Sequence, residues 1–397
     1  MPAIPTNHHT DPIRRYLTVL SALIVIILAG SCVSASATAA TGTPYLPPPT
    51  GAYPVGITSL HLTDTARQDP WVPQAGAREL MVSLWYPARS QGTRRASYMT
   101  PTESRLLLEG IGVTGVQPDV LSTTRTNAFS DAAPAGTTRA LPLVVLSPGF
   151  TWQRHSLSAL AEELASHGYV VAGIDHTYET FATTFPGGRV TTCAACQLED
   201  VVDFGKTAVE SRAADVTFVL DSLIGPRPVW RGASLIDPSR IAMAGSSLGG
   251  ATAGETMLRD TRVLAGINLD GRMFAPLPES GLSRPLLLMG QPAHHPGSTE
   301  DTTWDRDWQR LTGWKRWIVV TGSVHASFTD YDMLGNQIGL DLGSSLASTR
   351  SVEITRRYAR AFFDLHLRAT RQPLLDRPSP HYPEVTFCAP PTHTCTP

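Results

Sequence analysis

The chain has 397 residues, of which 42% are apolar and 17% are charged, and its formal net charge is −2. This length leaves room for two or three domains, and the apolar content is sufficient for a large core. A near-neutral chain lacks the basic surplus typical of nucleic-acid binding, so we expect no nucleic-acid partner.

The first forty residues have the pattern of an export signal. Arg14 and Arg15 precede an apolar run at Leu17–Ala29, and small residues follow at Ser34–Ala40. This is the order of a secretory signal peptide, and the apolar run is shorter than the roughly 20 residues of a membrane span. We therefore predict a signal peptide in residues 1–40 and a secreted protein. The alternatives are an uncleaved anchor helix and a twin-arginine signal.

The cysteines support the same compartment. Cys32 ends a segment that resembles a bacterial lipobox, so a lipid anchor at the cell surface through Cys32 is an alternative to secretion. Without it, four cysteines remain, and their spacing favours two local disulfides, Cys193–Cys196 and Cys388–Cys395. A four-cysteine zinc site fits less well because the second pair is seven residues apart, and a thioredoxin-like role lacks its βαβ context. We expect loop staples and no metal.

Strands dominate the pattern after a Pro-rich stretch at 41–55, which predicts an extended linker. The segments 56–62 and 79–86 alternate apolar and polar residues, as half-buried strands do. Further along, short apolar runs bounded by Gly or Pro are typical of strands buried inside a parallel sheet. These runs lie at 141–146, 169–174, 241–244, 263–269, 285–289 and 317–320.

Helical stripes of apolar residues lie between and after these runs, at 156–167, 208–223 and 352–367. Alternation of strands and helices without an internal repeat predicts one large doubly wound α/β domain at 56–370. A C-terminal tail, 371–397, carries the second cysteine pair.

One stretch, 90–140, interrupts the alternation. Apart from a short helix predicted at 103–109, it is rich in Gly, Thr and Ser. A long irregular insertion of this kind is usually a lid, a binding loop or a disordered segment, and here it is a candidate cover for a site.

The strongest functional motif is GSSLG at 245–249, a G-x-S-x-G sequence. A predicted buried strand precedes it and an Ala/Gly-rich helix start follows, which is the context of a nucleophile elbow. The glycines permit a sharp turn, and the helix N-terminus favours the negative charge that develops during acyl transfer. We predict that Ser247 is the nucleophile; the alternative is a serine that only caps the helix.

A serine hydroxyl needs a base to remove its proton. His325 lies just after the run at 317–320, the last position in the chain order Ser…Asp…His, and we predict that it is this base. We prefer it to His294 and His295, which we interpret as a solvated loop pair. His366 lies on the last helix, where we expect a surface or packing role.

The base in turn needs an acid that orients it. Asp270 directly follows the run at 263–269, at the strand end where sites of α/β proteins lie, and we predict that it is this acid. A helix-capping role is the alternative. The other candidates for the acid are Asp301, Asp305 and Asp307, which fall in an acidic helical stretch that we expect to face solvent.

Two backbone N–H groups should hold the oxyanion, and we assign them to Leu248 and Phe150. Leu248 follows the nucleophile, and Phe150 lies in the loop after the run at 141–146. We place Trp152, His176 and Phe328 at the substrate pocket.

At these residues the chain resembles the secreted platelet-activating-factor acetylhydrolase family of α/β-hydrolases, in a bacterial form. The resemblance is carried by LVVLSPGF at 143–150, YVVAGIDH at 169–176, RIAMAGSSLGG at 240–250, GINLDGRMF at 266–274 and GSVHASFTD at 322–330. It implies the α/β-hydrolase fold and supports Asp270 over its rivals. It also implies an ester or phospholipid substrate with a short sn-2 acyl chain, and contact with a lipid interface.

The sequence therefore predicts a secreted serine ester hydrolase that works through an acyl-enzyme and needs no metal or organic cofactor. A broad carboxylesterase, lipase or polyester hydrolase with the same residues is the first alternative. A catalytically silent surface-binding protein and a transacylase are the others.

Overall fold

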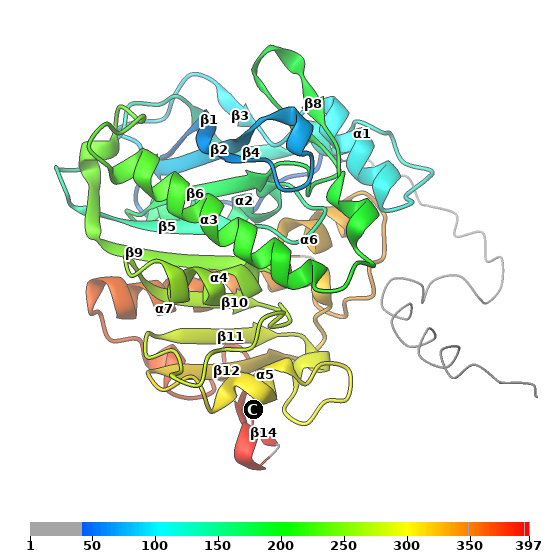
Figure 1. Ribbon diagram of the computed structural model, residues 1–397, viewed down its shortest axis with the longest axis vertical. Helices are drawn as coiled ribbons and strands as arrows, with labels where there is room; N and C mark the ends of the chain where they lie inside the picture. Colours follow the sequence, from blue (N-terminus) through cyan, green and yellow to red (C-terminus); the bar gives the residue numbers. More distant parts are fainter. Residues whose placement is uncertain (1–41, 348, 393, 397) are drawn as a thin grey trace, which may run out of the picture. The chain divides into compact units, whose positions relative to one another are not determined.

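A twelve-stranded sheet runs through the part of the chain that the computed structural model describes, residues 42–347, 349–392 and 394–396 (Figure 1). The predicted signal peptide and Cys32 lie outside these residues. The strands are β1 (Val55–Gln68), β2 (Ala77–Pro87), β3 (Arg95–Ser97), β4 (Arg125–Ser130), β5 (Leu141–Ser147), β6 (Val170–His176), β9 (Ile236–Ser246), β10 (Val263–Leu269), β11 (Leu286–Gly290), β12 (Lys315–Val320), β13 (Val385–Ala389) and β14 (Thr394–Thr396). Their order across the sheet is β14-β13-β12-β11-β10-β9-β5-β6-β2-β1-β4-β3.

The centre of the sheet, from β6 through β5, β9, β10 and β11 to β12, is parallel. Each of the six short apolar runs expected to form buried parallel strands overlaps one of these six strands, and the runs at 169–174 and 285–289 begin one residue before theirs. Antiparallel pairs flank the parallel block, β2 on β6 and β13 on β12. All carboxyl ends of the parallel strands therefore meet at one edge, where sites of α/β proteins form.

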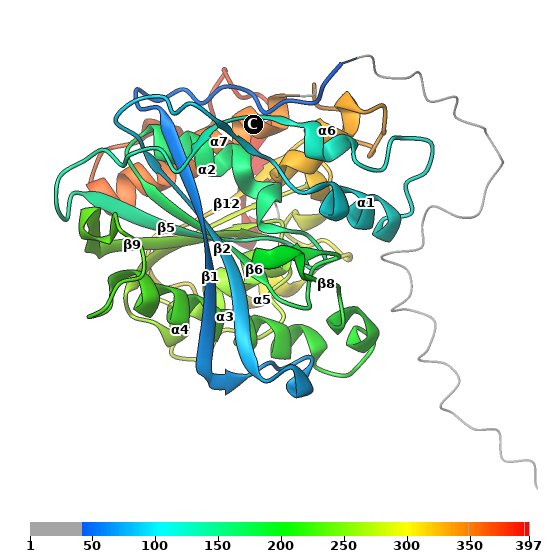
Figure 2. The ribbon, with the colours of Figure 1, turned by 90° about the horizontal axis from the view of Figure 1, so that it is seen from above.

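Helices cover both faces of this sheet. They are α1 (Pro101–Gly110), α2 (Ser158–Ser166), α3 (Phe204–Ile224), α4 (Leu248–Arg259), α5 (Thr303–Trp308), α6 (Asp330–Gln337) and α7 (Arg350–Arg368). Figure 2 shows α2 and α7 on one side and α3 and α4 on the other, and each pair buries an apolar stripe against the strands. In the described ranges, none of the helices combines the length and the apolarity that crossing a membrane requires.

The half-buried character expected for 79–86 is wrong. The strand there, β2, lies between β1 and β6, and nearly every one of its side chains is buried. Two of its polar residues are buried with partners: Ser83 accepts from Arg154 Nε at 2.8 Å, and Arg78 bonds Asp215. Glu79, at the start of the expected range, is partly exposed. Alternation in the sequence thus reflects internal hydrogen bonding here and not exposure to solvent.

The insertion at 90–140 is folded. Thr100 and Glu103 form a capping box that begins α1, and β4 and β3 extend the sheet beyond β1. Leu107 and Leu108 of α1 join a core cluster with Tyr331 and other residues of α6. Because α6 follows the loop of His325 closely, the insertion packs against the same end of the domain as the candidate site.

The Pro-rich segment is packed on the domain from residue 44 onwards. Leu46 is buried in the cluster that contains α1 and α6. The Arg356 guanidinium of α7 donates to the carbonyl oxygens of Pro47 and Pro48 at 2.9 and 3.2 Å. These contacts hold residues 44–54, which we call the strap, in an extended conformation across α2 and α7.

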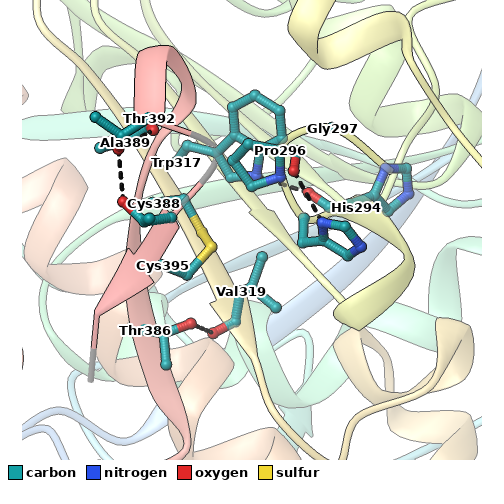
Figure 3. The surroundings of a disulfide bond; sticks show 12 residues. His294, Pro296, Gly297, Trp317, Val319, Thr386, Cys388, Ala389, Thr392 and Cys395 are labelled. Atoms are coloured by element: carbon teal, nitrogen blue, oxygen red, sulfur yellow. Dashed lines mark hydrogen bonds between the residues drawn. A yellow bond between two sulfur atoms is a disulfide. The ribbon is translucent and has the colours of Figure 1, made fainter. Parts of the chain in front are cut away.

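Both predicted cysteine pairs are disulfides in the structure. Cys193 bonds Cys196 in the stretch between β8 (Val190–Thr191), which pairs with β7 (Thr183–Thr184), and α3. Cys388 bonds Cys395 across the β13–β14 hairpin, at the end of the sheet next to Trp317 and Val319 of β12 (Figure 3). The two bonds close short local loops.

Candidate active site

Ser247 occupies a strained turn between the end of β9 and the first residue of α4. Its φ of +55° and ψ of −123° lie in a region that residues with a side chain rarely adopt. Two glycines make the turn sterically feasible. A Cβ on Gly249 would lie 2.0 Å from the Ser147 carbonyl oxygen, and one on Gly245 would lie 2.2 Å from the backbone of Gly249. The elbow expected from GSSLG is therefore present, and it leaves Ser247 partly exposed.

Asp270 lies beside this elbow, at the end of the next parallel strand. The Ser247 N–H donates to Leu269 O at 2.8 Å, and the Asp270 N–H donates to Met289 O at 2.9 Å, so the ladder fixes both residues at the same sheet edge. Gly271 lets the two turns approach closely, because a Cβ there would lie 2.1 Å from Ser247 O.

His325 reaches Asp270 from the loop after β12. Its Nδ1 lies 2.5 Å from Asp270 Oδ2, and the carboxylate also accepts from Gln291, from N to Oδ1 at 2.7 Å and from Nε2 to Oδ2 at 3.1 Å. Asp270 is 1% exposed, whereas 43% of the His325 side chain is exposed. A neutral His325 that donates from Nδ1 keeps Nε2 as an acceptor.

The loop after β5 passes on the other side of Ser247. We call residues 148–152, which contain the predicted oxyanion donor Phe150, the oxyanion loop. A Cβ on Gly149 would lie 3.4 Å from Ser247 Cβ, so the loop contacts the elbow. Thr151 has a φ of +70° and exchanges backbone hydrogen bonds with Glu179 and Phe181. The residues predicted to donate to an oxyanion, Phe150 and Leu248, thus flank Ser247 on two segments.

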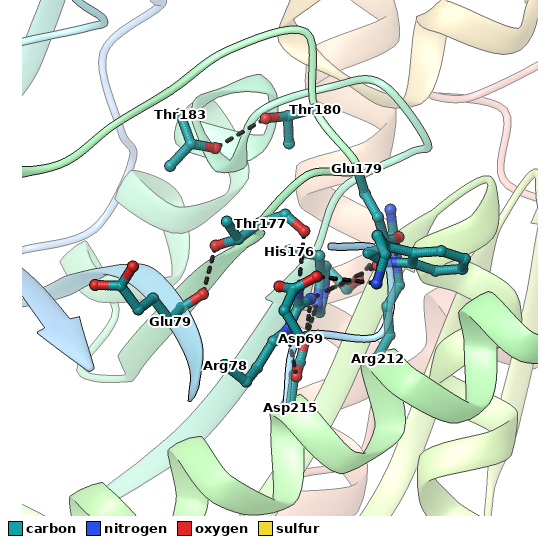
Figure 4. Close-up of polar contacts among 12 residues, drawn as sticks. Asp69, Arg78, Glu79, His176, Thr177, Glu179, Thr180, Thr183, Arg212 and Asp215 are labelled. Carbon is teal, nitrogen blue, oxygen red and sulfur yellow. Dashed lines mark hydrogen bonds and ion pairs between the residues drawn. The ribbon is translucent and has the colours of Figure 1, made fainter. Parts of the chain in front are cut away.

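A buried network of charged side chains, drawn in Figure 4, contacts the oxyanion loop through Arg212. Arg212 of α3 donates from Nε to Glu179 at 2.6 Å. Its Nη1 donates to Pro148 O, also at 2.6 Å. Arg78 bonds both Asp69 and Asp215 at 2.7 Å. Burial raises the pKa of Asp215, but the charge and hydrogen bonds of Arg78 outweigh burial and hold that pKa well below its ordinary value.

His176 belongs to this network and not to an open pocket, so the pocket role expected for it is wrong. It is fully buried, with Nε2 2.9 Å from Ser147 Oγ and Nδ1 2.9 Å from Asp215 Oδ2. Burial, with the charge of Arg212, lowers the pKa of His176 and favours the neutral ring that these two bonds need. The sequence showed that His176 ends a strand but not that α3 brings Asp215 against it.

The other two predicted pocket residues, Trp152 and Phe328, lie in different environments. Trp152 is partly exposed and its ring centroid lies 5.7 Å from that of His325, so it borders the candidate site. Phe328 is 2% exposed and packs in the core with α7, which contradicts its predicted pocket role.

An aromatic group that sequence reasoning missed lies on the Phe150 side of Ser247. The Phe204 ring is 5.1 Å from Phe150 and 5.5 Å from Trp71, and all three pack with Leu248. Trp71 comes from the loop before β2 and Phe204 from the start of α3, and no motif marks either position.

His294, Asp301 and Asp307 are buried, so the solvated positions expected for these three are wrong, whereas His295 is exposed and Asp305 is partly exposed. His294 is 6% exposed, and Asp301 and Asp307 are 6% and 2% exposed. His294 Nε2 lies 3.5 Å from Asp270 Oδ1. His366 packs between Trp314 and Phe362, which agrees with a packing role. In the ranges that the structure describes, no cluster of three or more His, Cys, Asp or Glu side chains is arranged to hold a metal ion.

A mostly parallel sheet flanked by helices, with a serine on the strand-to-helix elbow, defines an α/β-hydrolase. The chain belongs to the family described as platelet-activating factor acetylhydrolase, isoform II, whose model matches residues 38–192 and 232–372. The stretch between the matches, 193–231, holds the Cys193–Cys196 disulfide and all of α3, including Arg212 and Asp215.

Individual relatives agree with this assignment. A probable 1-alkyl-2-acetylglycerophosphocholine esterase of Arthroderma benhamiae is 26% identical, over 93% of this chain and 98% of its own length. The platelet-activating factor acetylhydrolase of Cavia porcellus is 27% identical over 59% of each chain. A solved ferulic acid esterase from Streptomyces cinnamoneus is 43% identical, with a TM-score of 0.79, over 88% of this chain and 100% of that one. The protein is a carboxylic ester hydrolase.

Proposed function

We propose that Ser247, His325 and Asp270 form a Ser–His–Asp triad that hydrolyses esters through an acyl-enzyme. The observation that carries the proposal is the 2.5 Å contact of His325 with Asp270 beside a serine held on a strained elbow. The same three residue types in the chain order Ser…Asp…His are typical of α/β-hydrolases.

The proposed reaction begins when His325 Nε2 accepts the proton of Ser247 Oγ as the oxygen attacks the ester carbonyl. The N–H groups of Phe150 and Leu248, with the N-terminus of α4, stabilise the oxyanion. Asp270 orients His325 and stabilises its protonated ring. The alcohol leaves with a proton from His325, and water then releases the acid by the same steps in reverse order.

Three classes of ester are candidates for the substrate. Family membership supports a short acyl chain at the sn-2 position of a phospholipid, as the name of the Arthroderma benhamiae relative describes. The identity with the Streptomyces cinnamoneus enzyme and the rings of Trp71, Phe150 and Phe204 support an aromatic acid ester as the second candidate. A broad esterase that takes tributyrin or a polyester stays the third.

We also propose that the protein is exported and works at a lipid interface. The two disulfides support an oxidising compartment. Val201, Val202 and Phe274 are 57%, 85% and 42% exposed near Phe204, an apolar surface for such contact. N-terminal sequencing of protein from culture medium, against a Cys32→Ala variant, distinguishes a cleaved signal from a lipid anchor. Vesicle cosedimentation tests the contact.

The mechanism is tested with Ser247→Ala, which should lose all hydrolysis of p-nitrophenyl acetate and all labelling by a fluorophosphonate probe. Ser246→Ala is the matched control. If Ser247→Ala hydrolysed the ester at the wild-type rate, the triad would be refuted. If the probe failed to label the folded wild-type protein, a catalytically silent binding protein would be favoured.

The substrate class is tested with a panel of acetylated phospholipid, methyl ferulate, tributyrin and polyester film, which ranks the substrates by rate. Added alcohol detects acyl transfer, because a transacylase passes the acyl group to the alcohol instead of water.

A further inference from the structure

A second histidine contacts the aspartate of the proposed triad from the side opposite His325. His294 Nε2 lies 3.5 Å from Asp270 Oδ1, while His325 bonds Oδ2. The other ring nitrogen of His294 lies 3.2 Å from Asp301 Oδ2. The four side chains thus form a row: His325, Asp270, His294 and Asp301.

The protein around His294 is built to hold its ring. The imidazole stacks on Trp304, with ring centroids 4.3 Å apart and planes 17° apart. The His294 carbonyl accepts from Trp317 Nε1 at 2.8 Å, and Figure 3 shows Trp317 between His294 and the Cys388–Cys395 bond. Gly290 makes room, because a Cβ there would lie 3.0 Å from His294 Cβ and 3.1 Å from Asp270 Oδ1.

Electrostatics favour a protonated ring at this position. Burial lowers the pKa of His294, but the contact with Asp301 and the charges of Asp270 and Asp301 outweigh it, so the pKa is raised. Burial raises the pKa of Asp301, but the contact with His294 and the Thr303 N–H, which donates at 2.8 Å, lower it overall. Beyond these groups, Arg272 Nε lies 3.8 Å from Asp301 Oδ1, and His325 lies across Asp270.

We propose that His294 is a positioning residue that links Asp270 Oδ1 to Asp301 and so, together with the Gln291 hydrogen bonds, directs Oδ2 towards His325. The proposal rests on the triad proposed above. His294 does not touch the reacting atoms in this arrangement. It acts on Asp270 through orientation and through charge, because a cation beside Asp270 offsets part of the negative field that His325 experiences.

This role predicts two separable effects of His294→Gln. Asp270 Oδ1 keeps its bond from the Gln291 N–H in this variant, so loss of the His294 contact should lower kcat by no more than about 10-fold. KM should be nearly unchanged, because orientation matters in the transition state and His294 is buried. Loss of the positive charge strengthens the field of Asp270 on His325 and favours its protonated form. The acid limb of the kcat/KM profile should therefore move to higher pH, by about half to one unit.

The matched control is His295→Gln, the exposed neighbour whose Nδ1 lies 2.9 Å from Pro296 O. It should leave both kcat and the acid limb unchanged. Asp301→Asn keeps His294 in place and tests the charge directly. In this variant the imidazole NMR signals of His294 should titrate at lower pH than in the wild type, where they should titrate above the ordinary value of 6.5.

An unshifted acid limb in folded His294→Gln, or a His294 titration unaffected by Asp301→Asn, would overturn the positioning role. Fluorophosphonate labelling of Ser247 separates this result from failure of the triad. If labelling and Ser247→Ala behave as expected while His294→Gln behaves like the wild type, only the positioning role fails.

Discussion

Arg212 Nη1 donates to the carbonyl oxygen of Pro148 at 2.6 Å, across 64 residues of sequence. The bond joins α3 to the oxyanion loop one residue before Gly149, which lies against Ser247. In the proposed mechanism the Phe150 N–H points at the developing charge, so the direction of this N–H depends on Arg212, a fully buried side chain.

We expect Arg212→Lys to lower kcat about 10-fold or more with little change in KM. The planar guanidinium of Arg212 bonds Glu179 and the Pro148 carbonyl at the same time through different nitrogens. The single ammonium group of a lysine cannot reproduce this geometry. Steady-state kinetics with p-nitrophenyl acetate checks this, with Arg259→Lys on the surface as the control. A folded Arg212→Lys with wild-type kcat would show that the loop holds its shape without the bond.

Replacing Gly249 by Ala should abolish activity and destabilise the fold by about 3 kcal/mol, the upper range for forced overpacking. The added methyl group would meet the Ser147 carbonyl oxygen at 2.0 Å, and backbone cannot move aside cheaply. Urea unfolding measures the change. Gly254→Ala is the control in the same helix: its nearest neighbour is the flexible Met273 side chain at 3.1 Å, so it should be neutral or stabilising. Equal stability of the two variants would contradict this account of the elbow.

Asp270→Asn should reduce kcat about 10³- to 10⁴-fold while the protein stays folded. The amide oxygen still accepts from the Gln291 N–H, so the strand end keeps its shape, but the charge that stabilises protonated His325 is gone. Steady-state kinetics tests the loss of kcat, and a thermal melt of the same sample tests whether the protein stays folded. Loss of less than about 10-fold would assign the orienting role to another acid.

Glu163 should make the strap at 44–54 sensitive to acid. Its carboxylate accepts from Thr50 N at 2.8 Å and Thr50 Oγ1 at 2.6 Å, and it lies 3.1 Å from His167 Nε2. Burial raises the pKa of Glu163, but the bonds from His167 and Thr50 outweigh it and lower the pKa from 4.5 to about 2. A lowered carboxyl pKa gives stability that is complete above pH 4.5 and is lost as the pH falls towards 2.

The expected size of this effect at pH 3 is about 2 kcal/mol. Urea unfolding at pH 7 and pH 3 should therefore show a smaller loss of stability for Glu163→Gln than for the wild type. Glu353→Gln, at a more exposed ion pair, should behave like the wild type. An identical pH dependence in the wild type and Glu163→Gln would contradict the prediction.

Local sequence was informative where one segment determines its own structure. The parallel strands are short apolar runs that need burial on both faces, and the GSSLG turn requires its glycines wherever it occurs. Ser247 and Asp270 directly follow such strands and His325 lies in the loop after another, so their shared edge could be predicted from the order of strands alone.

Prediction failed where the environment of a residue comes from distant segments. His294 stands in a Pro/Gly loop that resembles a solvated turn, but Trp304 and Trp317, from other segments, pack against it. His176 looks like a pocket residue at a strand end until α3 supplies Asp215. A polar residue can be buried when a distant segment of the chain supplies its hydrogen-bonding partner. The local pattern of hydrophobicity does not identify that partner.

The sheet ends in a strand of three residues on each side, β3 and β14. Unpaired N–H and C=O groups on a long outer strand are a template on which another chain can add a strand and start aggregation. The Cys388–Cys395 bond holds β14 on β13 and so keeps the longer β13 paired on both sides. Reducing that bond would therefore threaten the solubility of concentrated protein by opening an edge for strand addition.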